Sequence, residues 1–434
     1  MNASAFASHP LLLPNGYELV RLGYVARLQN GLTVDAKRDV TGDVVTRPYL
    51  RVANVQAGSL DLDSVTEITV PRSVARRSTL RPGDVLMTEG GDLDKLGRGT
   101  VWEGELDSCL HQNHIFAIRP DPRRLSGKFL AYVTQSLYGR SYFESTGTRT
   151  TNLASTNSSK IQSFPLPLPP LKEQRRIADF LDAETARIDS LIDARDRQLE
   201  KLKERWSSGL AAQVEQLISD HGLISLRRVI RSVEQGWSPQ CEDAIATPDE
   251  WAVLKTSAVS SGAFRPLEQK RLPGELRPDV RYQLGDGDLL MTRGSGSPEY
   301  VGVPAVVRAE GRKLLLSDLL YRIRTDKGWN SDFVALMLKS SPVRGFMSLL
   351  FRGQSGQTIK LRAEDIKAIE VPDAPVDQQE RLTKKLSAEE RKIEDVRGVI
   401  ARSSALLAER RQALITAAVT GQLDVATVGQ TDVA

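Results

Sequence analysis

PPLKEQRRI, at residues 169–177, is the stretch that decides the fold, because a second copy, APVDQQERL at residues 374–382, follows later in the chain. The two copies lie 205 positions apart, as Pro170 and Pro375 show. In both, proline, which is excluded from a helix interior, precedes a charged segment suited to a first helical turn. Each copy therefore predicts the start of a long helix.

A heptad pattern follows each copy, with core positions in alternating steps of four and three residues. This spacing is typical of helices that wind around a partner helix. Glu184 and Glu389 occupy the same step, where an apolar residue would pack better. Each either makes a register-setting contact, with Arg195 or Arg410 as partner, or lies solvated at the edge of the seam. The core positions are Ile177, Leu181, Glu184, Ile188, Leu191, Arg195, Gln198 and Leu202, and then Leu382, Leu386, Glu389, Ile393, Val396, Ile400, Ser403 and Leu407.

Length and composition limit the classes of protein. With 434 residues the chain is too long for one hydrophobic core, and the repeat indicates two similar globular domains with two long helices. A net charge of +4 is compatible with nucleic-acid binding but does not establish it. Cys109 and Cys241 form no disulfide framework, so we expect a reducing compartment. No apolar run reaches the roughly 20 residues that span a bilayer, and we expect a cytoplasmic protein without a signal peptide.

The globular segments repeat as well. GDVLMT at residues 83–88 recurs as GDLLMT at residues 287–292, and each indicates a Gly-Asp turn that leads into a buried strand. The next loops differ, EGGD at 89–92 against RGSGS at 293–297, as expected when each copy recognises a different target. Each copy is therefore predicted to be a mixed α/β domain of about 150 residues.

These features, together with the closing ITAAVTG at residues 415–421, resemble the specificity subunit of type I restriction-modification enzymes over nearly the whole chain. The resemblance implies an α+β fold in which two mixed α/β target-recognition domains in tandem are separated by two long antiparallel coiled-coil helices. The expected divisions are a disordered N-terminus at 1–16, target-recognition domain 1 at 17–170, spacer helix 1 at 171–220, target-recognition domain 2 at 221–373, spacer helix 2 at 374–420 and a C-terminal tail at 421–434.

The resemblance also implies partners, namely double-stranded DNA, two DNA methyltransferase subunits and, through them, a restriction endonuclease and translocase subunit. S-adenosylmethionine, ATP and Mg are then expected on those partner subunits, and no cofactor on this chain. The second copy departs from the pattern, with Gln378 where the first has Glu173. The residues expected to bind the partner subunits are Pro170, Glu173, Gln174, Pro375, Gln378 and Gln379.

The chain carries no motif that would make it an enzyme. We find neither the Asn/Asp-Pro-Pro-aromatic loop and glycine-rich turn of a DNA amino-methyltransferase nor a phosphate loop ending in Gly-Lys-Ser/Thr. The chain also contains a set of residues like those of a nuclease metal site, which begins at Pro372-Asp373. Such a metal site needs its Glu and Lys on a strand, but here both fall in the second heptad helix, which argues against a nuclease. Cys109, His111 and His114 have the spacing of zinc ligands, but a fourth ligand is lacking, and a packed strand is the favoured interpretation. We therefore predict no catalytic residue and no metal site.

DNA contacts are expected from side chains that can make forked hydrogen bonds to base edges and that lie on the divergent loops. Arg and Lys among them can instead grip phosphate, which positions the protein without specifying sequence. The alternative function is a coiled-coil adaptor that binds protein or RNA through its duplicated domains. The candidate DNA-binding residues are Arg51, Asn54, Glu89, Arg98, Gln112, Asn113, Arg149 and Asn152 in the first copy, and Lys255, Arg293, Ser295, Arg352, Gln354, Gln357 and Lys360 in the second.

Overall fold

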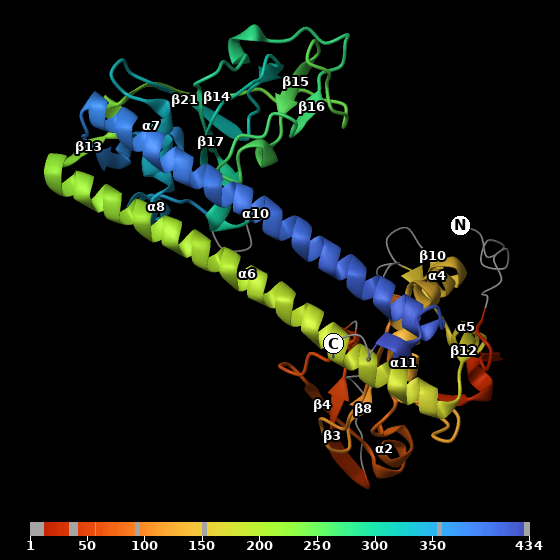
Figure 1. The fold of residues 1–434 in the computed structure, drawn as a ribbon. Coiled ribbons are helices and arrows are strands. Elements are labelled where there is room, and N and C mark those ends of the chain that lie inside the picture. The colour runs from red at the N-terminus through yellow and green to blue at the C-terminus, as the bar shows by residue number, and fades with distance from the viewer. Residues whose placement is uncertain are drawn as a thin grey trace. The chain divides into compact units, whose positions relative to one another are not determined.

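The computed structural model describes residues 13–33, 42–56, 58–91, 96–149, 154–353 and 358–428. The chain forms two compact units (Figure 1). The first unit consists of Met1–Arg195 with Ala401–Ala434, and the second of Asp196–Ile400. Their boundaries fall inside the two long helices, α6 (Leu171–His221) and α10 (Val376–Val419). None of the helices in the described ranges has the length and apolar character that a membrane span requires.

The first unit is built on a four-stranded antiparallel sheet with the order β2-β9-β5-β7. Its central strand β5 comes from the GDVLMT stretch, and Val85, Leu86 and Met87 are all fully buried, which explains the continuous apolar run. A second sheet, β4-β3-β8, pairs β3 and β8 in parallel, and two small sheets are ordered β10-β11-β6 and β1-β12. The strands are β1 Glu18–Arg21, β2 Ala26–Asn30, β3 Val44–Leu50, β4 Thr66–Pro71, β5 Val85–Thr88, β6 Gly90–Gly91, β7 Gly99–Val101, β8 Leu110–His111, β9 Ile115–Pro120, β10 Thr148–Arg149, β11 Ala154–Ser155 and β12 Pro165–Leu168.

The second unit repeats this topology, except that the two-stranded sheet β18-β22 stands where the first unit has the three-stranded sheet β10-β11-β6. Its four-stranded sheet is β14-β21-β17-β19, its three-stranded sheet is β16-β15-β20, and its two small sheets are β18-β22 and β13-β23. The three-stranded sheet again pairs one strand couple in parallel, β15 with β20. The strands are β13 Leu223–Ser225, β14 Ile230–Gln235, β15 Trp251–Leu254, β16 Gln269–Arg271, β17 Leu289–Thr292, β18 Gly294–Ser295, β19 Pro304–Val306, β20 Lys313–Leu315, β21 Leu320–Thr325, β22 Ile359–Lys360 and β23 Glu370–Pro372.

Short helices cover the sheets in both units. In the first, α3 packs on β5 and β7, and in the second, α7 packs on β17 and β19. These helices are α2 Arg72–Ser78, α3 Gly127–Gln135, α4 Leu137–Thr146, α5 Ser158–Gln162, α7 Ser331–Lys339, α8 Ser341–Ser348, α9 Ala363–Ala368 and α11 Val425–Val428. The mixed α/β character and the two long helices predicted from the sequence are confirmed.

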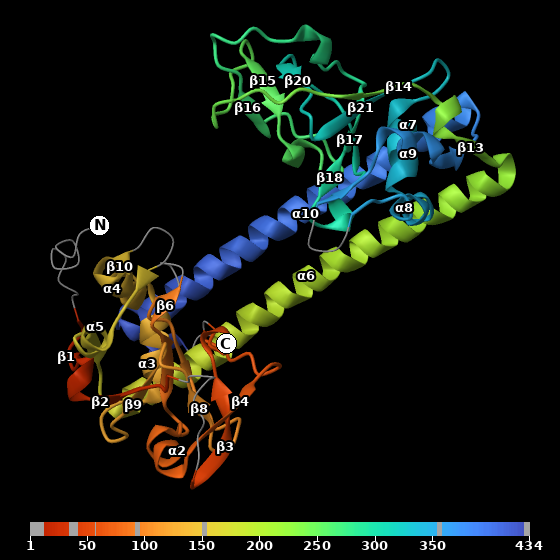
Figure 2. The ribbon, with the colours of Figure 1, turned by 180° about the vertical axis from the view of Figure 1, so that it is seen from behind.

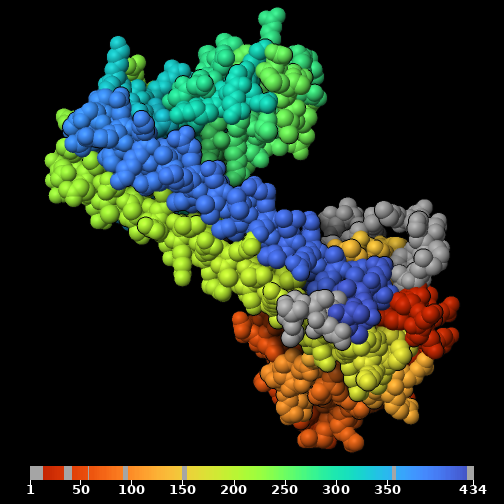
Figure 3. All heavy atoms as spheres, viewed as in Figure 1, coloured from red at the N-terminus to blue at the C-terminus, as the bar shows by residue number. Residues whose placement is uncertain are grey.

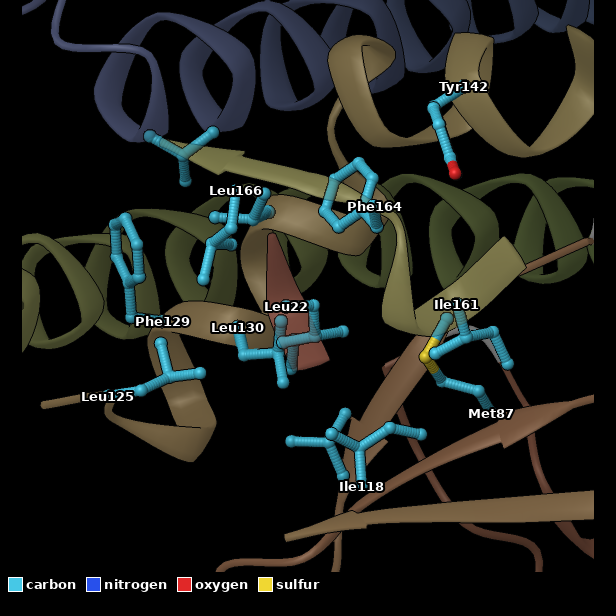
Figure 4. Close-up of a cluster of buried hydrophobic side chains, with 14 of the residues drawn as sticks. Leu22, Met87, Ile118, Leu125, Phe129, Leu130, Tyr142, Ile161, Phe164 and Leu166 are labelled. Atoms are coloured by element: carbon cyan, nitrogen blue, oxygen red, sulfur yellow. The ribbon is translucent and has the colours of Figure 1, made fainter. Parts of the chain in front are cut away.

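The main core of the first unit joins its sheet to both long helices. Figure 4 shows Phe129 and Leu130 of α3 near Leu166 of β12 in this cluster. The same cluster contains Ile177 and Leu181 of α6 together with Ile415, Ala418 and Val419 of α10. Because Asp189 of α6 also receives a hydrogen bond from Arg411 of α10, the two helices run antiparallel within this unit.

The second unit has an equivalent core in which the roles of the two long helices are exchanged. Leu210, Val214 and Leu217, near the end of α6, share a cluster with Leu386, near the start of α10. The His221 Nε2 and Gln378 Oε1 atoms lie 2.9 Å apart, so these helix ends lie against each other in this unit (Figure 3). Each unit thus takes one part of both long helices into its own core.

The register-setting contact considered for the two seam glutamates is not formed. Glu184 lies 3.9 Å from Arg187 on its own helix. Thr185 is the buried residue at this step, and its hydroxyl donates to the carbonyl of Leu181. Glu389 is exposed. Glu389 therefore fits the alternative of a solvated carboxylate, whereas Glu184 is half-buried at the edge of the helix face, near Arg187 of its own helix.

Candidate nucleic-acid interface

A glycine at the same place in both units brings two loops into close contact. A Cβ atom on Gly31 would lie 2.0 Å from the carbonyl oxygen of Gln112, and one on Gly236 would lie 2.1 Å from that of Leu316. Beside them, the amide of Leu32 donates to His111 at 2.8 Å, and that of Trp237 donates to Leu316 at 3.0 Å. Only glycine permits this approach of backbone to backbone. The contact fixes the loops that carry residues 112–114 and 317–319.

In each unit, one equivalent backbone hydrogen bond joins the end of the central strand to this loop. The amide of Glu89 donates to the carbonyl of His114 at 2.8 Å, and the amide of Arg293 donates to that of Leu319 at 3.0 Å. Glu89 and Arg293 therefore occupy the same structural position. Their surroundings differ, because Glu89 Oε2 lies 2.5 Å from His114 Nδ1, whereas Arg293 Nη1 donates only a long 3.4 Å bond to the carbonyl of Asp318.

In the second unit, four candidates gather on one edge, which we call the second reading edge: Arg293, Ser295, Arg352 and Lys360. Ser295 lies in β18 (Figure 2), and β18 pairs with β22. The amide of Arg352 donates to the carbonyl of Lys360, and the amide of Leu361 donates to that of Arg293. Arg352 and Lys360 are exposed. Gln354 and Gln357, also candidates, lie outside the described residues.

In the first unit, the corresponding first reading edge contains Glu89, Gln112, Asn113 and the backbone of Arg149. Arg149 lies in β10, which pairs through β11 with β6, directly after Glu89. The amide of Val52 donates to Gln112 Oε1 at 3.3 Å. Arg51 is exposed on the turn after β3, and Arg98 lies half-buried just before β7. Asn152 lies outside the described residues.

Two candidates are held by partners within the protein. Asn54 is only 4% exposed, and its side chain accepts from the amide of Arg51 and donates to the carbonyls of Asp61 and Ser64. It closes a turn, and we therefore withdraw it from the proposed interface. Lys255 lies 3.1 Å from Asp243, and this hydrogen bond lowers the pKa of that carboxyl group. Lys255 is thus already paired in the free protein.

Gln174 and Gln379, expected to bind partner subunits, are instead buried at 0% and 1% exposure. Gln174 Oε1 accepts from the amide of Ser126, and its Nε2 donates to the carbonyls of Arg124 and Pro169. Gln379 makes the same three kinds of bond at the equivalent positions, to Asn330, Gly328 and Ala374. Both glutamines tie a helix start to its unit. Neither presents a surface to a partner, which corrects that expectation.

The other residues expected to bind partner subunits remain accessible. In the first unit, Pro170 and Glu173 line a groove of about 910 Å³ together with Tyr17 and the segment 421–424. Burial, with a contribution from Glu173, raises the pKa of Tyr17 to about 12, so its phenol stays neutral and can donate a hydrogen bond. In the second unit, Pro375 is exposed, and Gln378 is in contact with His221.

The favoured interpretation of a packed strand agrees with the structure for Cys109 and His111, which lie beside and in β8, but His114 lies in an exposed turn before β9. Cys109 and His111 are buried, and the three residues are not a cluster that could hold a metal, nor is any such cluster found within the described ranges. Burial raises the pKa of the Cys109 thiol to about 12 and lowers the pKa of His111. His114 points to Glu89 instead.

Comparison with known proteins gives consistent matches. Residues 14–201 match the family model of the type I restriction modification DNA specificity domain. The EcoKI specificity subunit of Escherichia coli (strain K12) is 26% identical over 396 residues, covering 86% of this chain and 82% of that protein. The StySPI specificity subunit of Salmonella potsdam is 23% identical, covering 72% of this chain and 69% of that protein. A chain solved in work on complex assembly and conformational transition of the type I R-M system has a TM-score of 0.70 at 16% identity, covering 95% of this chain and 100% of the other.

Two mixed α/β units of one topology, each with a loop edge that carries different side chains, define a protein with two separate recognition surfaces. By these matches the chain is similar over most of its length to specificity subunits of type I restriction-modification systems, and residues 14–201 match the model of their DNA specificity domain.

Proposed function

We propose that each unit reads one half of a bipartite, asymmetric DNA target and that the chain recruits the methyltransferase and restriction subunits that act there. The observation that carries this proposal is the pair of reading edges. They share one backbone scaffold but present different side chains at equivalent positions, as with Glu89 and Arg293. Different hydrogen-bonding groups on one scaffold favour different bases. An adaptor for protein or RNA would not need this divergence.

The domain boundaries given in the sequence analysis are part of the proposal. Residues 17–170 and 221–373 would be the recognition domains, and the long helices the spacers between them. We propose that α6 and α10 pack antiparallel as a coiled coil over their whole length. This extends the antiparallel contacts seen inside each unit, such as that of Asp189 with Arg411. The unread gap between the half-sites would then depend on helix length.

The chain itself is proposed to be non-catalytic. S-adenosylmethionine, ATP and Mg would be bound by the partner subunits. Two methyltransferase copies would dock at the two helix starts, where Pro170 and Glu173 line the groove of the first unit and Pro375 and Gln378 are the equivalents in the second. The repetition of this helix start supports two equivalent docking sites, one for each half-site.

The test is selection from a random duplex library by the chain assembled with its methyltransferase subunits. We expect enrichment of one motif with two specified parts, unequal in sequence and separated by a gap of fixed length. Enrichment of no motif would refute a sequence-reading role. Enrichment of RNA over duplex DNA in a parallel selection would favour the adaptor.

A further inference from the structure

We propose that the shared position at the end of β5 and β17 reads one base in each half-site with opposite hydrogen-bond polarity. Glu89 would accept a hydrogen bond from an exocyclic amino group, that of cytosine or adenine. Arg293 would donate to the N7 and O6 atoms of guanine. This inference rests on the proposed function and adds the chemical class of base that each reading edge selects.

The position is the same in both units by three observations. The residue follows the central strand directly, its amide donates to the loop after β8 or β20, and it precedes a two-residue strand, β6 or β18. The bonds to His114 and Leu319 are 2.8 and 3.0 Å long. Because the backbone is held alike, the two side chains leave the scaffold from equivalent points. The chemical difference between them is then the difference in what the two units can recognise.

Glu89 cannot serve as a phosphate contact. Its carboxylate, when ionised, only accepts hydrogen bonds and is repelled by the DNA backbone. On a DNA-binding surface it is favourable where it meets a donor, and the base-edge donors in the major groove are the amino groups of cytosine and adenine. Its side chain is 33% exposed, so it is accessible.

His114 is the residue that orients this carboxylate. Its Nδ1 lies 2.5 Å from Glu89 Oε2, and an ionised carboxylate there requires the imidazole N–H to donate. No other hydrogen bond of the Glu89 side chain is present within the described ranges, so Oε1 keeps its capacity to accept from a base. We assign His114 as a positioning residue, since it acts through Glu89. It was considered in the sequence only as a metal ligand.

Arg293 has the opposite chemistry and a different setting. Its 3.4 Å bond to the Asp318 carbonyl occupies one guanidinium nitrogen weakly, and a guanidinium has five N–H donors. Its neighbour across the shared position is Leu319, 51% exposed, where the first unit has His114. A leucine side chain has no donor to orient a carboxylate, but it also has no acceptor that would compete with a base for the N–H groups of a guanidinium. In each unit, the neighbour therefore suits the side chain at the shared position: His114 suits the carboxylate of Glu89, and Leu319 suits the guanidinium of Arg293.

The experiment maps methylated sites in cells that express the chain with its methyltransferase subunits. For Glu89→Gln we expect the base preference to change at one position of one half-site, with methylation of the original site reduced about 5- to 150-fold. The other half-site and the gap should stay as they are. The matched control is Glu67→Gln, which removes an exposed carboxylate from β4 and should change nothing.

Three further variants separate a positioning role of His114 from general damage to the protein. His114→Ala should relax the preference at the same position as Glu89→Gln, and His114→Gln, which keeps an N–H donor, should restore much of it. The double variant Glu89→Arg with His114→Leu should install guanine there. A uniform loss of methylation with unchanged motif, or no change at all, would overturn the assignment. If the unaltered complex methylates no bipartite motif, it is the proposed function itself that fails.

Discussion

At the scale of the residue, Gln174 holds three backbone groups of the first unit: the amide of Ser126 and the carbonyls of Arg124 and Pro169. Leucine at this position would leave these groups buried without partners, at a cost of about 1–3 kcal/mol for each. We expect Gln174→Leu to lower the free energy of unfolding by several kcal/mol in urea denaturation. Lys172→Leu, an exposed neighbour on the same helix, should change it by less than about 0.5 kcal/mol. Equal effects of the two variants would contradict the structural role of Gln174.

A second prediction at this scale concerns glycine. The same Gly→Ala substitution should destabilise the protein at one site and stabilise it at another. Gly31→Ala would place a methyl group 2.0 Å from a carbonyl oxygen, so the loops must separate, which we expect to destabilise the protein by about 1–3 kcal/mol. Gly209→Ala, in α6 with nothing within 4 Å of the new atom, should stabilise it by about 0.5–1 kcal/mol. Thermal unfolding of both variants measures the difference, and a stabilised Gly31→Ala protein would show that the loops are not in close contact.

At this scale the sequence predicted which residues are repeated. It did not predict whether each polar side chain stabilises the fold or contacts a partner. Gln174 lies three and seven residues before Ile177 and Leu181, which places it on the buried face of its helix. That spacing was a signal for burial, but a polar residue in a charged motif reads equally well as a partner contact. Asn54 was equally ambiguous, because a turn-closing amide and a base-reading amide have the same chemistry. Only the tertiary fold shows which carbonyls lie within reach.

At the scale of the element, the heptad pattern predicted the long helices closely. The long helix expected to begin at residue 171 is observed as α6, Leu171–His221, because proline and glycine punctuate its ends clearly. The side-chain register was less predictable. Thr185, not Glu184, is buried, since short helices and sheet of each unit pack on parts of α6 and α10 and change which face is covered. A pattern in one helix does not specify the elements that pack against it.

The spacer role of these helices gives the prediction at this scale. A helix rises about 1.5 Å per residue, so inserting four residues near Gln198 adds about 6 Å. With base pairs about 3.4 Å apart, the gap in the methylated motif should lengthen by one or two base pairs while both half-sites stay intact. Methylation mapping in cells carrying the insertion measures this. An unchanged gap with altered half-site bases would mean that the helices do not determine the spacing.

At the scale of the whole molecule, we propose that this chain supplies recognition and that its partner subunits supply the chemistry. The purified chain alone should therefore show no methyl transfer, DNA cleavage or ATP hydrolysis. Transfer of a labelled methyl group from S-adenosylmethionine to DNA, assayed with and without the methyltransferase subunits, checks this. Transfer by the isolated chain would contradict this division between recognition and chemistry.

Whether the two units read separate half-sites is tested by comparing the methylated motif of the assembled complex carrying Arg293→Ala with that of the unaltered chain. For the unaltered chain we expect a bipartite, asymmetric motif. With Arg293→Ala, one position of one half-site should relax, and cognate methylation should fall about 5- to 150-fold, the effect of losing one base-reading fork. The first unit's half-site and the gap should not change. A motif altered in both halves, or equal loss at every site with no change of base, would contradict the claim.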